Sequence, residues 1–151
     1  MAREYSGNGS VAVGTDKTLL TLQSAATIRP ELYEFIIGCG ATPADLTTIF
    51  HLERFTAAGT EGSGFTPFAL HPSTAAATGD YGVGVFSVEP TYTASAILLR
   101  IAVNQRQTLR WVASGPYLGF YAPATAANGI GLQSQSSGGT AAHDVTMFHR
   151  E

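Results

Sequence analysis

Charge is scarce in this chain. Lysine, arginine, aspartate and glutamate make up 13% of its 151 residues, whereas a soluble domain usually contains about 25% of charged residues. The formal net charge of -3 argues against a nucleic-acid-binding protein, which normally carries a basic excess. Because charges keep soluble monomers apart, their shortage indicates a surface that is covered in an assembly. The alternative is a β protein whose loops consist of small, uncharged residues.

Lysine is almost absent among the cations. Seven of the eight basic residues are arginine, and Lys17 is the exception. The planar guanidinium group binds carboxylates through two hydrogen bonds and is weakly hydrated, so arginine is favoured over lysine at protein interfaces. The arginine excess therefore supports an interface, although a GC-rich genome would produce the same bias.

Cysteine and long apolar runs are also missing. The single cysteine, Cys39, excludes an internal disulfide and a cysteine-rich zinc site. No apolar run reaches the roughly 18 residues that a transmembrane helix needs. The first residues, MAREYSGNGS, lack the apolar core of a secretory signal. We expect no membrane partner, and a protein that acts where it is made or where an assembly carries it.

Helical periodicity is nearly absent, and apolar and polar residues alternate instead. Alternation with period two is typical of strands with one buried face. Strands are predicted at 17–23, 31–38, 48–56, 65–71, 83–89, 96–103, 107–113, 117–122, 130–135 and 143–150. Clusters of Gly, Ser, Thr and Ala between them are typical of loops. About eight to ten short antiparallel strands predict an all-β sandwich or barrel, and a jelly-roll-like β-sandwich of two four-stranded sheets is the most economical arrangement.

The predicted strands form one domain. We expect a single β-sandwich domain over 16–151 and a flexible N-terminal arm over 1–15, because unpaired terminal segments are usually poorly ordered. Arg3 and Tyr5 could hold this arm on a neighbouring subunit.

One segment carries a helical signal. In ATPADLTT, Thr42 could cap a helix, Pro43 suits the first helical position, and Asp45 would lie near the positive helix end. We predict at most one short helical turn near 43–47, because strand-forming residues follow.

Two strands and a tight turn are predicted for ILLRIAVNQRQTLRWVA, residues 97–113. A two-residue turn would set the apolar side of one strand against the charged side of the other, whereas a three-residue turn at 104–106 gives one apolar face. This register places Arg100 directly opposite Arg110 on the outer face, where like charges destabilise a sheet. We expect a compensating carboxylate, either Glu53 or an acidic residue of a partner chain; two side chains splayed into solvent are the alternative.

No pattern of catalytic residues stands out. The four histidines are not spaced as metal ligands, although His51 and Glu53 share one face of a predicted strand. Cys39 lacks an adjacent base, and no helix follows the glycines of GDYGVG to hold a phosphate. We predict surface or loop histidines, no catalytic residue, no cofactor and no metal, and therefore no enzyme. A metal-dependent cupin is the enzyme that such a fold would accommodate.

Aromatic residues crowd the segment PYLGFYAP, residues 116–123. Tyr117 and Tyr121 fall on one face of the predicted strand, and Phe120 falls on the other. Aromatic side chains on an outward face suit a sugar-binding platform or a subunit interface. The alternative is that one face belongs to the core, as we predict for Trp111 on the apolar face of the hairpin.

Five motifs give the chain a resemblance to a known family. They are TPAD, RFTAAGT, EPTYTA, NQRQTLRWVA and PATAANGIGL, in this order, and the resemblance spans roughly residues 38–132. On these motifs the chain resembles a family of small virion structural proteins of tailed bacteriophages. It departs from the family where a Gly-Gly-Glu-Leu loop often follows the tryptophan strand, because SGPYLGFYAPA stands there instead.

The resemblance implies a jelly-roll head decoration protein, also called a cement protein. Such a protein is made in the host cytoplasm, binds the major capsid protein and its own copies on the phage head surface as a homotrimer, and stabilises the shell. Nucleic acid and membrane are not implied as partners. The alternatives are a carbohydrate-binding module with a surface glycan as partner, and a tail- or fibre-associated structural protein. The residues that we expect at a protein–protein interface are Arg3, Tyr5, Arg100, Arg110, Tyr117 and Tyr121.

Overall fold

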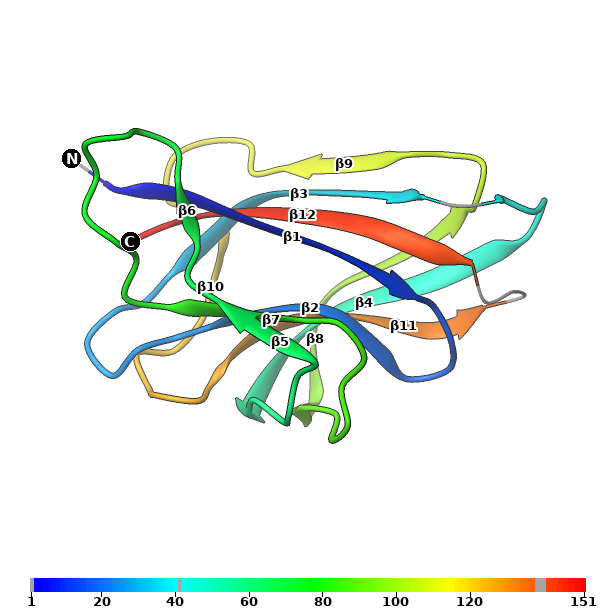
Figure 1. Ribbon diagram of the computed structural model, residues 1–151, viewed down its shortest axis with the longest axis horizontal. Helices are drawn as coiled ribbons and strands as arrows, with labels where there is room; N and C mark the ends of the chain where they lie inside the picture. The colour runs from blue at the N-terminus through cyan, green and yellow to red at the C-terminus, as the bar shows by residue number, and fades with distance from the viewer. Residues whose placement is uncertain (1, 41, 138–140) are drawn as a thin grey trace.

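The computed structural model of the protein describes residues 2–40, 42–137 and 141–151. In these ranges every regular element is a strand, and the strands form two antiparallel sheets that pack against each other (Figure 1). The described residues include no helix long and apolar enough to cross a membrane. The prediction of an all-β sandwich is confirmed.

Each sheet has six strands. The first sheet contains β1 (Glu4–Ala12), β3 (Glu31–Cys39), β6 (Phe68–Ala69), β9 (Leu109–Val112), β10 (Phe120–Tyr121) and β12 (Ala142–Arg150). The second sheet contains β2 (Lys17–Gln23), β4 (Thr47–Ala57), β5 (Ser63–Phe65), β7 (Asp80–Val83), β8 (Thr91–Asn104) and β11 (Gly129–Ser137).

Strands distant in sequence are neighbours in both sheets. The first sheet has the order β10-β3-β12-β1-β6, and β9 pairs with β3 as well. The second sheet has the order β5-β7-β2-β11-β4-β8. The two ends of the chain lie side by side in Figure 1, where the backbone N–H of Arg3 donates to Glu151 at 3.1 Å and that of Glu151 donates to Arg3 at 2.9 Å.

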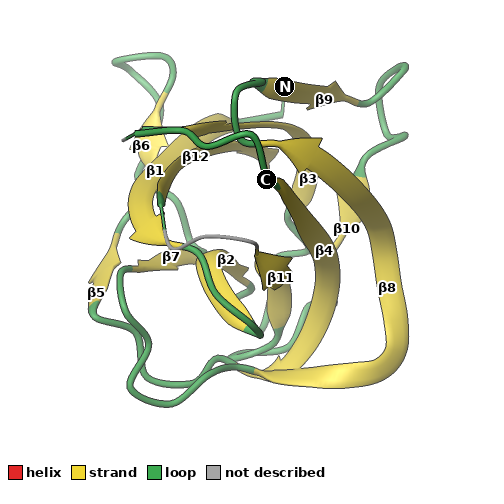
Figure 2. Ribbon diagram, turned by 90° about the vertical axis from the view of Figure 1, so that its right-hand side faces the viewer, coloured by secondary structure: helices red, strands yellow, loops and turns green. Residues whose placement is uncertain are grey.

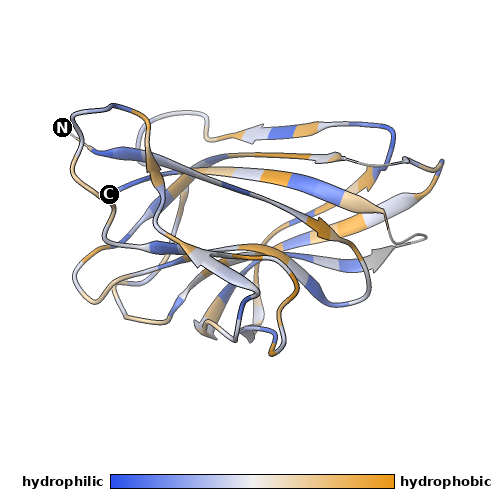
Figure 3. Cartoon of the chain, viewed as in Figure 1, coloured by the Kyte–Doolittle hydropathy of each residue, from blue (hydrophilic) through white to orange (hydrophobic). Residues whose placement is uncertain are grey.

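The predicted alternation produces the core between the sheets. Along β12, His143, Val145, Met147 and His149 are buried, whereas the residues between them are at least partly exposed. Figure 3 shows hydrophobic residues in the middle of this strand and hydrophilic residues on either side of them, because the buried set includes two histidines. Large apolar side chains from both sheets meet in the interior, among them Leu20, Leu22, Leu32, Phe35, Ile37, Phe50, Leu52, Tyr81, Ile130 and Leu132.

The prediction of a flexible N-terminal arm over 1–15 is wrong for residues 4–12. They form β1, which pairs with β12 along its whole length. Glycine and serine replace the usual apolar residues here because side chains of β7 occupy the space: a Cβ atom on Gly7 would overlap the ring of Tyr81, and one on Gly9 would overlap Val83. The glycines of β1 therefore allow close packing against β7.

The helical turn near 43–47 does not form; the chain makes only a bend at Asp45. Side chains at the end of β8 and directly after it bind this segment instead. Asn104 donates from Nδ2 to Asp45 Oδ1 at 2.7 Å. The backbone N–H of Ala44 donates to Gln105 Oε1 at 3.1 Å. The Asp45 carboxylate thus accepts from a side chain, whereas in a helical turn it would accept from backbone N–H groups.

Two predicted strands were placed poorly. The stretch 65–71 is divided between β5 and β6, and 83–89 is mostly a loop that follows β7. Gly84, with a φ of 93°, lies in the left-handed region that favours glycine. The chain then leaves the sheet, and Phe86, which belongs to no strand, is buried.

Candidate functional site

The predicted hairpin at 97–113 is wrong, because its two strands belong to different sheets. β8 pairs with β4 in the second sheet, whereas β9 pairs with β3 in the first (Figure 2). The connection is held by Gln105, which is buried and whose backbone N–H donates to Leu46 at 2.9 Å. The segment between the strands is therefore a corner of the sandwich.

The two arginines consequently lie apart and have different surroundings. Arg110 donates from Nε to Glu34 Oε1 at 2.7 Å, so the expected carboxylate belongs to this chain but is not Glu53. Glu53 lies 2.9 Å from Nδ1 of His51, through Oε1, and both residues are buried. Arg100 is exposed and forms no ion pair with any described residue.

Arg100 lies on β8, the longest strand of the protein and the last in its sheet. Within the described ranges this strand pairs only with β4. Its other edge presents backbone N–H and C=O groups to the surroundings, and an edge of this kind is a template for pairing with another chain. Ile97 is 45% exposed beside it. β8 therefore combines an unpaired backbone edge, the exposed side chain of Ile97, and Arg100, whose guanidinium group has no carboxylate partner among the described residues.

The residues predicted near the N-terminus have separate positions. Arg3 is exposed. Tyr5 is fully buried; its hydroxyl donates to the Ala75 carbonyl at 2.9 Å and its ring stacks on His149 with centroids 5.2 Å apart. The prediction that Tyr5 contacts a neighbouring subunit is wrong, because the residue belongs to the core of its own chain.

Tyr117 and Tyr121 come together, although not on one strand. Tyr117 lies in the turn before β10 and is 75% exposed, while Tyr121 is in β10. Both line a hollow of about 380 Å³ with Arg29, Glu31, Arg150 and Glu151. These four charged residues could not be grouped from the sequence, because they come from two distant stretches, one around the start of β3 and one at the end of β12. Arg29–Glu31 was the one local signal.

Trp111 is packed and does not form a platform. Its ring stacks on Phe35, with centroids 5.7 Å apart, and on Phe120, with centroids 4.7 Å apart. The prediction that Trp111 packs with the core is therefore confirmed, with partners in the first sheet in place of β8.

The histidines are not mainly surface residues. His51, His143 and His149 are buried and His71 is exposed. Burial lowers the pKa of His143, and this effect outweighs the hydrogen bond to the Ala141 carbonyl and the nearby Asp144. Over the residues described, no three histidine, cysteine or acidic side chains are grouped to hold a metal ion.

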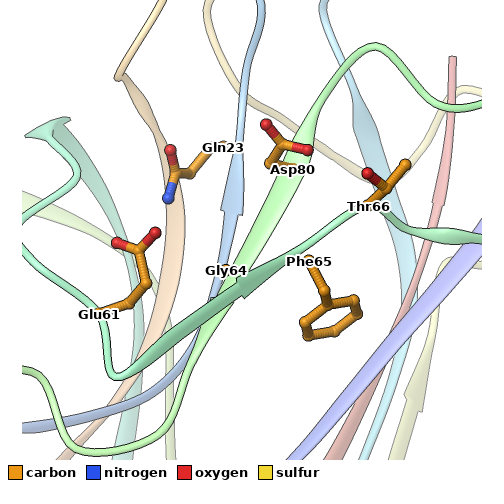
Figure 4. Close-up of a pocket in the computed structure, with 6 residues that line it drawn as sticks. All are labelled: Gln23, Glu61, Gly64, Phe65, Thr66 and Asp80. Atoms are coloured by element: carbon orange, nitrogen blue, oxygen red, sulfur yellow. The ribbon is translucent and has the colours of Figure 1, made fainter.

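A second hollow, of about 270 Å³, lies beside β5 and β7 (Figure 4). Glu61, Asp80 and Gln23 line it, and the Phe65 ring points away from these polar groups. Burial raises the pKa of Asp80, and the carboxylates of Glu61 and Glu151 raise it further. The hollow therefore concentrates negative charge.

Comparison of the chain with protein-family models, with curated proteins and with solved structures finds no match.

Proposed function

We propose that this protein is a structural protein of a tailed-phage virion, which decorates the head by binding the major capsid protein and copies of itself. One observation carries the proposal: β8 is a long edge strand on which Arg100 has no carboxylate partner among the described residues. An edge strand with exposed apolar residues promotes association unless another chain covers it. The motifs that resemble the phage family, RFTAAGT and EPTYTA, include the end of β4 and the start of β8.

Exposed apolar side chains support an interaction role. Larger exposed apolar areas mark protein–protein contacts in soluble proteins. Val112 lies at the end of β9 and Leu118 in the loop after it. In the part of the chain that the structure describes, the exposed large apolar side chains are Leu46, Phe68, Leu70, Val85, Val88, Ile97, Val112, Tyr117 and Leu118.

The strand order supports the jelly-roll form of the sandwich. The order β1-β12-β3-β9 packs against β2-β11-β4-β8, and two four-stranded sheets of this kind, each joining early and late strands, are what a jelly roll contains. The strands β5, β6 and β7 extend these sheets at one side. Viral capsid domains use this architecture repeatedly, which is an analogy of fold and not of site.

The shell would be stabilised by mass action. A protein that binds the assembled lattice and not the dissociated subunits shifts the equilibrium toward the lattice. A contact between β8 of one copy and a different surface of the next would be heterologous, and such a contact closes into a ring when the rotation permits it. A homotrimer is the ring that we propose.

The test uses heads from which the protein has been removed. Adding back the purified protein should restore resistance of the heads to heat and to chelators, and Arg100→Glu should require a higher concentration for the same effect. Equal resistance of stripped and restored heads would overturn the cement role.

A further inference from the structure

The hollow beside β10 has the shape and chemistry of a small binding site. Its volume of about 380 Å³ lies within the range of roughly 300–1,000 Å³ that is typical of ligand pockets. It is formed where the loop before β10, the start of β3 and the end of β12 meet. The side chains that matter are Tyr117, Tyr121, Arg29, Arg150, Glu31 and Glu151.

Tyr117 is held in a conformation that its side chain disfavours. Its φ is 63°, in the left-handed region that a bulky residue rarely adopts. The residue is nevertheless 75% exposed, so packing in its own chain does not explain the strain. Strained residues of this kind occur most often where a ligand or partner is held.

The polar groups of the hollow are fixed in place. Glu31 is buried and accepts a hydrogen bond from the Gly119 backbone N–H at 2.9 Å. Arg150 lies 3.8 Å from Glu31 and donates to Glu4 at 3.0 Å. The guanidinium of Arg29 lies 5.9 Å from the centre of the Tyr121 ring. Donors and acceptors are thus positioned before any ligand arrives, which reduces the entropy lost on binding.

The charges identify the class of ligand. The lining carries two guanidinium groups and two carboxylates, so they cancel and an anion or a cation gains little from the hollow. A neutral ring with several hydroxyl groups suits it better, because hydroxyls donate to carboxylates and accept from guanidinium groups. A tyrosine ring offers an apolar face to the C–H side of such a ligand.

We propose that this hollow binds a neutral hexopyranose unit of an oligosaccharide, stacked on Tyr117 and hydrogen-bonded by Glu31 and Arg150. The site would be separate from the capsid contact that we place on β8, because the hollow is built from the first sheet. The protein would therefore bind the head through one face and a glycan through another.

The test is binding of the purified protein to an array of neutral oligosaccharides (glucans, galactans and mannans) and acidic ones (sialylated and uronic-acid glycans). We expect at least one neutral glycan to bind, with at least tenfold weaker binding for Tyr117→Ala and Tyr121→Ala. Phe68→Ala, which removes an exposed aromatic ring elsewhere on the surface, should leave binding unchanged. Failure of every neutral glycan to bind, binding of acidic glycans only, or equal binding by the Tyr117 variant would overturn the proposal.

A glycine variant separates binding from folding. Tyr117→Gly removes the ring but relieves the backbone strain, since glycine adopts a φ of this sign freely. The variant should melt no lower than the parent protein, lose glycan binding and still attach to heads. Unchanged glycan binding would show that the hollow is not the site. Loss of glycan binding together with normal attachment to heads would show that the glycan site and the capsid contact are separate.

Discussion

Arg110 donates from Nε to Glu34 Oε1 at 2.7 Å, between diagonal positions of the paired strands β9 and β3. The Arg110 side chain is 63% exposed, so water and salt screen this pair and it should contribute little to folding. Arg100, by contrast, has no ion-pair partner among the described residues.

Arg100 and Arg110 should therefore differ in how much each contributes to cosedimentation of the protein with phage heads. Arg100→Ala should weaken cosedimentation with heads about tenfold, as expected when a partner's carboxylate loses its cation. Arg110→Ala, the matched control, should change it little. Both variants should unfold in urea at nearly the parent midpoint. A reversed order, with Arg110→Ala the weaker binder, would contradict the assignment of the interface to β8.

The hydroxyl of Tyr81 should be important for stability. It donates to the Met147 carbonyl at 3.2 Å and lies 2.9 Å from Nδ1 of His149, and all of these groups are buried. Tyr81→Phe leaves buried polar groups without a partner, which should lower the free energy of unfolding by about 1–3 kcal/mol. Tyr117→Phe, which removes an exposed hydroxyl, should have no effect in the same urea titration. Equal midpoints for parent and Tyr81→Phe would show that this network does not stabilise the fold.

Close packing of β1 against β7 should make Gly7 intolerant of a side chain. A Cβ atom there would overlap the ring of Tyr81, and the shift needed to accommodate it should cost about 1–3 kcal/mol. Asn8→Ala is the control, because Asn8 is exposed on the same strand. If Gly7→Ala and Asn8→Ala denature at the same urea concentration, the packing of β1 is looser than described.

Asp80 should destabilise the protein at neutral pH. Its pKa is raised by burial, by Glu61 and by Glu151, so the folded state binds its proton more tightly than the unfolded state does. Protonated Asp80 therefore adds to the free energy of unfolding. This contribution is complete at pH values below the pKa of Asp80 in the unfolded state, and it is lost as the pH rises through the pKa of Asp80 in the folded state.

Asp80→Asn should consequently raise Tm at pH 7, and the gain should disappear below about pH 4, where aspartate is protonated in both states. The measurement is Tm against pH for the parent, Asp80→Asn and the control Asp16→Asn, which removes an aspartate away from Glu61 and Glu151. A gain of the same size at every pH would contradict the electrostatic origin.

Local patterns predicted the strands of the central sheets well. The stretch 17–23 coincides with β2, and 143–150 matches β12 within a residue at its start. In both strands β-forming residues recur and turn residues lie at the ends, so the information is local. The all-β class followed from the same signals.

The errors arose where distant parts of the chain decide the structure. β1 was missed because its glycines are explained only by Tyr81 and Val83 on another strand. The hairpin was predicted because consecutive strands usually pair, whereas buried Gln105 directs β8 and β9 into different sheets. The two tyrosines of the hollow were identified from sequence, but their charged neighbours were not, because these lie far away in sequence, around the start of β3 and at the end of β12.

The central claim is that the protein covers a phage head by binding the capsid lattice. A density map of the proposed phage particle tests this claim most directly. We predict sandwich-shaped density on the outer surface of the head, in groups of three, with β8 against the capsid protein or a neighbouring copy. Density confined to the tail or its fibres, or a head surface free of such features, would contradict the account.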